Sequence, residues 1–384
     1  MLDNKTLEQL TTLRRTLHQH PELSGNEIKT AERIAVFLEK TRPDNIVHNI
    51  GGNGLIAEFG GREDGPTIMF RCELDALPLE EKNTVSYKSI VVNAAHLCGH
   101  DGHMAILAGL ASYLKENRPK NGRILLLFQP SEEVGKGASM VIQDPHFRQF
   151  EPDYIFALHN LPGYPLHEVV LSKQHFASAS SGMFIQLKGK SSHAAEPEKG
   201  INPGMGMAQM IIAFHDMLKI QNFFQNFTLI TPIHMRLGNI AYGTSPGEGV
   251  IHLTLRSYLD SDMQLLKKEL QNLVKSISKR ESLSYKINYE EVFPATVNDP
   301  SCVSIAEQAV RDLKLRSSHK REPFKWSEDF GHFTSIYPGA LLGLGSGTDQ
   351  PALHNPDFDF PDELILTGST LFINICRQIL SFKN

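Results

Sequence analysis

The stretch His96-Leu97-Cys98-Gly99-His100-Asp101-Gly102-His103-Met104-Ala105 is the strongest indicator of the fold. It brings a cysteine, three histidines and an aspartate together, and thiolate and imidazole are ligands for zinc-like or manganese-like ions. It predicts a metal site at the start of an amphipathic helix, with an ordinary helix cap that contains incidental histidines as the alternative. The apolar side chains that follow at helical spacing are Met104, Ile106, Leu107, Leu110 and Leu114.

Polar side chains recur where predicted buried strands end. Open α/β sheets bind ligands at the carboxyl ends of their strands, so we expect these groups to face one crevice. The alternatives are an ordinary acidic surface pair and histidines that are hydrogen-bonded at strand or loop ends. The strands and the groups that follow them are 67–74 with Asp75, 123–128 with Glu132 and Glu133, 154–158 with His159, and 340–344 with His354.

The composition excludes several classes of protein. The chain has 384 residues, of which 41% are hydrophobic and 21% charged, as expected for a globular chain long enough for two domains. The net charge is −5, and no basic run suits a phosphate backbone, so nucleic acid is not an expected partner. The sequence begins without an apolar signal region and has no membrane-length apolar run. We therefore expect a cytoplasmic protein without a membrane partner.

The four cysteines are scattered without the spacing of a disulfide framework, so reduced thiols are expected. Only Cys98 has neighbours that can share a metal ion. A competing interpretation makes Cys98 a nucleophilic thiol activated by His100 or His103, but it leaves the carboxylates and histidines at the strand ends unexplained.

Two helices are predicted before the first buried strand. Leucines at helical spacing mark the first, which Pro21 ends, and the second covers 29–40. His18 and His20 lie near the end of the first helix. We interpret both as structural, because histidines there commonly bind helix carbonyls or interact with the helix dipole.

The segment from about 181 to 289 has a different pattern. Its order of strand, helix, strand, strand, helix, strand predicts a small α+β domain inserted into the first domain. The predicted helices cover 204–218 and 262–279. A loop at 188–197 holds His193 among small residues, either presented to a site or merely solvated.

Taken together, the motifs resemble those of the di-metal amidohydrolases of peptidase family M20. This group includes bacterial aminoacylases, hippurate hydrolases and plant hydrolases of indole-acetyl amino acids. The likeness covers nearly the whole chain. The matching motifs are Arg15-Thr16-Leu17-His18 with Pro21-Glu22, Arg71 through Pro78, Cys98 through His103, Glu132-Glu133, Leu158-His159, His193-Ala194-Ala195, Ser327-Glu328-Asp329-Phe330 and Leu353-His354-Asn355-Pro356.

The resemblance implies a three-layer, zinc-peptidase-like α/β catalytic domain formed by residues 1–180 and 290–384. It also implies that residues 181–289 form an inserted, smaller α+β domain with a ferredoxin-like fold. This insert would act as a lid and as the dimerisation domain of a homodimer.

The same resemblance implies a ligand set for two divalent metal ions, with the Cys98 thiolate near or between them. Manganese, zinc, nickel and cobalt all suit a mixture of thiolate, imidazole and carboxylate. Glu132 would be the general base, and Asp75 a further residue of the catalytic site that, like Glu328, orients ligands. The ligands would be Cys98, His100, Glu133, His159 and His354.

The implied activity is hydrolysis of the amide bond of N-acyl amino acids or similar small amides, with metal-bound water as the nucleophile. Arg256 would bind the free carboxylate of the substrate, and His193 would hydrogen-bond the developing oxyanion. The alternatives are a dipeptidase or aminopeptidase with the same site, and a non-catalytic small-molecule binding protein that keeps the fold.

The chain departs from the family pattern at several positions. Thr244 stands where relatives carry an asparagine, and its hydroxyl donates only one hydrogen bond. Glu73 replaces the usual aspartate, and Glu198 and Asn202 stand where histidine and aspartate are common. These changes concern the amino-acid portion of the substrate and leave the implied metal ligands intact.

Overall fold

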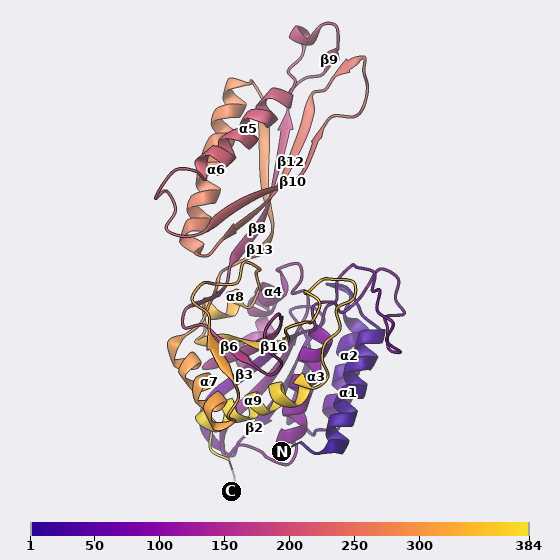
Figure 1. Ribbon diagram of the computed structural model, residues 1–384, viewed down its shortest axis with the longest axis vertical. Helices are drawn as coiled ribbons and strands as arrows, with labels where there is room; N and C mark the ends of the chain where they lie inside the picture. Colours follow the sequence, from indigo (N-terminus) through magenta and orange to yellow (C-terminus); the bar gives the residue numbers. More distant parts are fainter. Residues whose placement is uncertain (1, 383–384) are drawn as a thin grey trace. The chain divides into compact units, whose positions relative to one another are not determined.

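Residues 2–382 are described by a computed structural model, in which the chain separates into two units (Figure 1). The larger unit comprises Met1–Phe176, Thr296–Glu322 and Glu328–Asn384. The smaller unit comprises Ala177–Ala295 and Pro323–Ser327. It is therefore longer at both ends than the predicted insert 181–289 and adds a short segment from further along the chain.

A mixed sheet of eight strands forms the centre of the larger unit. Its strands are β1 (Asn45–Ile50), β2 (Gly54–Gly60), β3 (Glu63–Glu73), β4 (Asn121–Gln129), β5 (Tyr154–Pro162), β6 (Val169–Leu171), β15 (Ser317–His319) and β16 (Gly339–Gly347). Their order in the sheet is β1-β2-β4-β3-β5-β16-β6-β15. The neighbours β4, β3, β5 and β16 all run parallel, so their carboxyl ends meet at one edge.

Helices cover this sheet, because its strands carry apolar side chains on both faces. In β4, Ile124, Leu126 and Phe128 belong to the main hydrophobic core, yet Leu125 and Leu127 between them are also fully buried. Such continuous burial is typical of parallel strands covered on both sides, and it confirms the predicted three-layer α/β fold. The helices of this unit are α1 (Asn4–Gln19), α2 (Ile28–Glu39), α3 (His100–Leu114), α4 (Gly137–Gln143), α7 (Pro300–Asp312), α8 (Gly331–Thr334), α9 (Leu364–Ile379) and the 3-10 helix η1 (Pro145–Phe150).

Helix α3 begins directly after Cys98 and Gly99, as predicted, but it is not amphipathic. All of its residues except Ser112 are buried, because α3 contacts α1, α2 and α9 as well as β3 and β4. A helix that is apolar all round belongs in a core. The stretch predicted to bind metal therefore leads into an almost entirely buried helix.

The smaller unit has the predicted ferredoxin-like fold. Its main elements follow the order β8 (Ala179–Lys188), α5 (Gly204–Met217), β10 (Thr228–Leu237), β12 (Glu248–Ser257), α6 (Asp260–Arg280) and β13 (Ser284–Phe293). The strands form an antiparallel sheet in the order β10-β12-β8-β13. Figure 1 shows α5 and α6 side by side on one face of this sheet. A second hydrophobic core lies between the helices and the sheet.

The remaining elements are short. They are β7 (His175–Ala177), β9 (Ser192–His193), η2 (Pro197–Lys199), β11 (Thr244–Ser245) and β14 (Thr296–Val297). Among residues 2–382, no helix combines the length and apolar character needed to cross a bilayer. The predicted cytoplasmic location stays a prediction.

Candidate metal centre and active site

The strand ends bring most of the predicted metal ligands to one edge of the large sheet. Glu133 follows β4, and His354 follows β16. His159 differs from the prediction, because β5 continues past it and pairs it with Gly343 of β16. Cys98 and His100 come from the turn that opens α3. Gly99 in this turn has φ +93°, a conformation that glycine adopts without strain.

The five predicted ligands form two groups that share one residue. Cys98, His100 and His159 make one group, and Cys98, Glu133 and His354 make the other, with the ligand atoms of each group within 4.8 Å of one another. The Oε1 atom of Glu133 lies 3.8 Å from His100 Nε2, and its Oε2 atom lies 3.8 Å from His354 Nε2. We call these five residues the donor set.

The imidazole rings of the donor set are oriented by backbone carbonyls. His100 Nδ1 donates a hydrogen bond to the Asp75 carbonyl at 2.8 Å, and His159 Nδ1 donates to the Asn160 carbonyl at 2.9 Å. With Nδ1 as the donor, Nε2 is the nitrogen of each ring that could coordinate a metal ion, an arrangement typical of metal-bound histidine. His159 Nε2 faces Cys98 Sγ at 3.5 Å.

Two buried atoms of the donor set show that it fits a cation. Among residues 2–382, neither His100 Nε2 nor Glu133 Oε1 has a hydrogen-bond partner. Unsatisfied buried polar atoms are costly, and here they face each other. Thiolate, imidazole and carboxylate donors in two linked groups suit two divalent cations.

Asp75 acts on the donor set through other residues. Its Oδ2 atom accepts hydrogen bonds from the Ser24 hydroxyl at 2.7 Å and from the Glu133 backbone N–H at 2.9 Å. Its Oδ1 atom lies 3.6 Å from His100 Nδ1. Burial would raise the pKa of Asp75, but these partners hold it below the ordinary value. Asp75 is therefore placed to position both His100 and Glu133.

Glu132 lies beside the donor set with one carboxylate oxygen anchored. Its Oε1 atom accepts a hydrogen bond from the Asp329 backbone N–H at 3.2 Å, and its Oε2 atom lies 4.0 Å from His100 Nε2. Burial, together with Glu328 and Glu133, raises the pKa of Glu132 well above its ordinary value. Burial likewise raises the pKa of Glu133 to about 7. Nearby cations would favour the charged form of both carboxylates.

The environment of Cys98 argues against the nucleophilic thiol. Burial and the neighbouring Glu133 and Glu132 raise the pKa of Cys98 well above its ordinary value, whereas a nucleophilic cysteine needs a lowered pKa. His103, one of the two predicted activators, contacts Glu73 at 2.7 Å and Asn160 at 2.6 Å through its two ring nitrogens. A cation in contact with the sulfur would instead stabilise the thiolate.

Arg71 is a buried arginine for which the sequence predicted no role. It forms ion pairs with acidic residues beside the donor set. Arg71 contacts Glu73, and its Nη2 atom lies 3.0 Å from Glu328 and 2.6 Å from Asp329. The cluster of Glu132, Glu328 and Asp329 therefore already has a cation of its own. The sequence signals for Arg71 were its place inside a predicted buried strand, where charged residues are rare, and its place at the start of the Arg71–Pro78 motif.

The two predicted substrate-binding residues lie in the smaller unit. His193 is exposed on β9, in register with Thr244 of β11. Arg256 projects from β12, and its Nη1 atom donates hydrogen bonds to the Lys325 carbonyl at 2.9 Å and the Ser327 hydroxyl at 3.1 Å. Their roles toward a substrate stay predictions.

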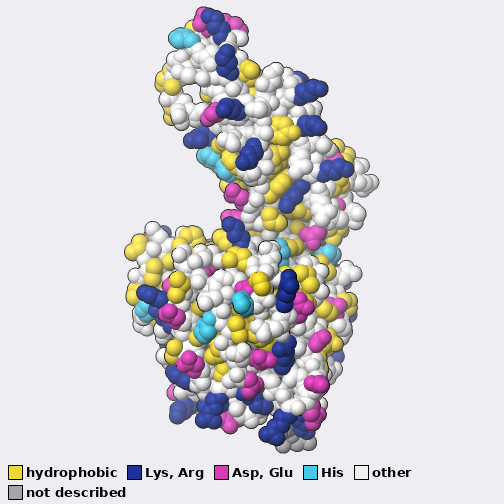
Figure 2. Space-filling view, turned by 180° about the vertical axis from the view of Figure 1, so that it is seen from behind, with side chains coloured by type: hydrophobic (Ala, Val, Ile, Leu, Met, Phe, Trp, Pro, Cys, Tyr) yellow, Lys and Arg dark blue, Asp and Glu magenta, His cyan; other side chains and the backbone are white. Residues whose placement is uncertain are grey.

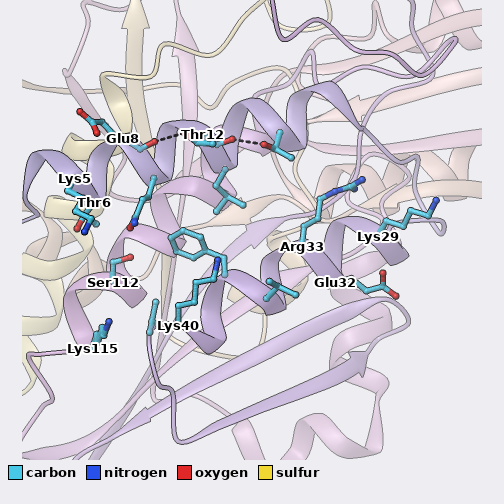
Figure 3. Close-up of a pocket in the computed structure, with 16 residues that line it drawn as sticks. Lys5, Thr6, Glu8, Thr12, Lys29, Glu32, Arg33, Lys40, Ser112 and Lys115 are labelled. Atoms are coloured by element: carbon cyan, nitrogen blue, oxygen red, sulfur yellow. Dashed lines mark hydrogen bonds between the residues drawn. The ribbon is translucent and has the colours of Figure 1, made fainter.

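A groove of about 970 Å³ lies between α1 and α2, lined by residues such as Thr12, Arg33, Phe37 and Lys40 (Figure 3). None of the donor set is among its described lining residues. The groove is therefore separate from the chemistry of the candidate site.

The fold and the donor set together define a metal-dependent hydrolase. The family model described as "Peptidase family M20/M25/M40" matches residues 69–378. The chain belongs to this family.

Individual relatives match along almost their whole length. An N-acetyl-L-cysteine deacetylase of Bacillus subtilis is 31% identical over 98% of this chain and 89% of its own. A hippurate hydrolase of Campylobacter jejuni is 28% identical over 96% of each chain. A crystal structure from Bacillus subtilis, titled a dinuclear metal binding peptidase from the M20 family, superposes with a TM-score of 0.83 at 25% identity, covering 97% of this chain and 98% of that one.

These findings confirm the predicted family, fold and class of enzyme. The chain is a metal-dependent amidohydrolase, and its donor set fits two divalent metal ions. The interpretation as a non-catalytic binding protein has no support among them.

Proposed function

We propose that this enzyme hydrolyses the amide bond of small N-acyl amino acids at the donor set, with Glu132 as the general base. The observation that carries the proposal is the pair of donor groups that share Cys98, with Glu132 beside them. The names of two relatives, an N-acetyl-L-cysteine deacetylase and a hippurate hydrolase, support the substrate class.

The metal ions would be held by the residues of the two groups, with Cys98 contributing to both. Manganese, zinc, nickel and cobalt are the candidates, because a mixed sulfur, nitrogen and oxygen donor set suits each of them. When bound, such ions polarise an amide carbonyl and bring the pKa of water towards about 7. His100, His159 and His354 supply neutral nitrogen donors, and Glu133 supplies a carboxylate.

Glu132 would move the proton. Its Oε1 atom is held by the Asp329 N–H, which leaves Oε2 on the side of His100 to remove a proton from the attacking water. The same carboxyl then protonates the nitrogen of the departing amine. Asp329 is in turn fixed by Arg71, so the base sits on a rigid support.

The smaller unit would recognise the amino-acid portion of the substrate. Arg256 contacts Lys325 and Ser327 through its Nη1 atom, and other N–H groups of its guanidinium would bind a carboxylate. His193 would hydrogen-bond the developing oxyanion, and Thr244, in register with it, offers one hydroxyl where relatives carry an amide.

The homodimer would form through the smaller unit. Strand β10 is an edge strand of its sheet and exposes Ile233, Met235 and Leu237. Figure 2 shows apolar side chains exposed on the surface of this unit. Exposed apolar edge strands favour pairing with another chain. We expect Ile233→Lys to shift the mass measured by light scattering from dimer to monomer, with Lys286→Glu on the opposite edge strand as the control.

Metal content and hydrolysis test the function together. Elemental mass spectrometry is expected to find about two ions per chain, consistent with a two-metal site. Activity on N-acetyl and N-benzoyl amino acids is expected to vanish with a chelator and return with added metal. A preference for dipeptides would favour the dipeptidase or aminopeptidase alternative. A protein that neither binds metal nor gains activity from it would contradict the proposal.

A further inference from the structure

Two buried cations near the end of α1 form a network that the proposed mechanism does not use. Arg14 and His18 are both fully buried. His18 Nδ1 lies 2.9 Å from Asp101 Oδ2, and its Nε2 atom lies 3.1 Å from Glu81 Oε1. The partners of His18 are therefore carboxylates and not the helix carbonyls expected for a structural histidine at this position. His20 does contact a helix carbonyl, with its Nδ1 atom 3.0 Å from the Thr16 carbonyl oxygen.

His18 carries its charge at neutral pH. Burial alone would lower the pKa of His18, but the carboxylates of Asp101 and Glu81 raise it to about 9. Arg14 adds a second buried cation, with Nη1 at 3.4 Å from Asp101 and 2.8 Å from Asp359. Burying charges costs free energy even when they are paired, and this cost offsets part of what the pairing contributes to stability. The value of the network lies in the geometry that it fixes.

The network reaches both groups of the donor set. Asp101 directly follows His100, which belongs to the group with His159. Asp359 lies five residues after His354, which belongs to the group with Glu133. Arg14 thus contacts a carboxylate in the segment that carries His100 and another in the segment that carries His354.

Two further contacts tie the same segments together. The His354 backbone N–H donates a hydrogen bond to the Leu97 carbonyl at 2.8 Å, next to Cys98. Tyr87 donates its hydroxyl proton to Asp359 at 2.6 Å and accepts from Arg14 Nη2 at 3.2 Å. The segment that carries His354 is therefore fixed against α1 as well as against the turn before α3.

We propose that Arg14 and His18 are positioning residues of the metal centre, which set the spacing between His100 in one donor group and His354 in the other. The inference rests on the proposed metal centre. Side chains that orient ligands from behind commonly change metal affinity by roughly 10- to 100-fold when they are removed. Neither residue belongs to the donor set, so both can be changed without removing a ligand.

The test is cobalt binding to His18→Gln protein that has been stripped of metal and titrated with Co²⁺ alone. Glutamine can keep one hydrogen bond, but it lacks the positive charge of His18 and cannot contact both Asp101 and Glu81 as the ring does. We expect this variant to bind cobalt at least about 10-fold more weakly than the wild type. We also expect a changed sulfur-to-cobalt absorption band, which reports the geometry at Cys98. His20→Gln is the matched control, since it removes a half-buried histidine from the same helix end.

A milder variant covers the case in which His18→Gln fails to fold. Tyr87→Phe deletes only the hydroxyl between Arg14 and Asp359, and it should weaken the binding of one of the two cobalt ions. Variants that fold and bind two cobalt ions with wild-type affinity and an unchanged sulfur-to-cobalt absorption band would overturn this inference but not the proposed metal centre. Wild-type protein that binds no cobalt would overturn the proposed metal centre, and this inference with it.

Discussion

The Nε2 atom of His100 lies 3.8 Å from the Oε1 atom of Glu133, and within residues 2–382 neither buried atom has a hydrogen-bond partner. Folding would not leave a ring nitrogen and a carboxylate oxygen unsatisfied in this way without a cost of about 1–3 kcal/mol each. Cations coordinated by these two atoms would remove that cost. The pair therefore marks where the two donor groups meet.

Because Cys98 belongs to both groups, its loss should differ from the loss of an outer ligand. We expect Cys98→Ala to lose both metal ions, whereas His354→Ala should keep about one, since the group with His159 remains complete. Elemental mass spectrometry after gel filtration measures the content. His20→Ala should keep both ions and serves as the control. Two ions retained by Cys98→Ala would remove the thiolate from the site.

Glu132 and Glu133 are adjacent but should respond differently to the same change. Glu132→Gln should keep the metal and lose about 10²- to 10⁴-fold in kcat, the usual contribution of a general base. Glu133→Gln should lose metal, because its carboxylate belongs to the donor set. Parallel measurements of metal content and kcat separate the two. Near-normal turnover of Glu132→Gln would show that another group moves the proton.

Arg256→Ala should raise KM for substrates with a free carboxylate by roughly 10- to 100-fold, as expected for one charged hydrogen bond. The corresponding substrate amides should change much less, because they lack the charge that Arg256 would bind. Arg236→Ala, an exposed arginine on the neighbouring strand β10, is the control. Equal effects on acids and amides would contradict the assignment.

The fold could be predicted because its signals are local. Buried strands and the insert follow from periodicity along single segments. The amphipathic prediction for α3 failed because its small residues, among them Gly102 and Ala105, allow close contacts on every side, and periodicity does not reveal which faces are covered. The end of β5 was misplaced for a related reason, since pairing with β16 extends the strand past His159.

The donor set was implied by the family resemblance, together with polar residues near strand ends and in the turn before α3, whereas its supports depend on contacts between distant segments. Arg71 and Asp329 are 258 residues apart in the sequence, and His18 and Asp101 are 83 apart. No local pattern pairs them, so the charge of His18 and the support of Glu132 became visible only in the folded chain.

The raised pKa of His18 makes the free energy of unfolding depend on pH in a defined window. The folded chain keeps this proton up to a pKa of about 9, while an unfolded histidine loses it near its ordinary value of about 6.5. The stabilisation is complete below pH 6.5 and lost progressively up to about pH 9. Urea unfolding of metal-free protein should therefore show a difference between wild type and His18→Gln that shrinks by up to roughly 3 kcal/mol across this range. A constant difference would mean that His18 is neutral.

The turn that carries the ligands should depend on Gly99 for two separate reasons, which a second glycine can distinguish. Gly99 has φ +93°, and a Cβ atom there would lie 2.3 Å from Asn160 Oδ1, so Gly99→Ala adds a clash to an unfavourable backbone. Gly25 has φ +83°, and an added Cβ atom there would have nothing within 4 Å. Gly25→Ala therefore carries only the cost of the unfavourable backbone conformation. We expect Gly25→Ala to cost about 1–2 kcal/mol in unfolding free energy and Gly99→Ala about 1–3 kcal/mol more. Only Gly99→Ala should also weaken metal binding, because Asn160 adjoins the proposed ligand His159 and its backbone carbonyl orients that ring. Equal unfolding free energies for the two variants would show that the turn can shift to admit the added carbon.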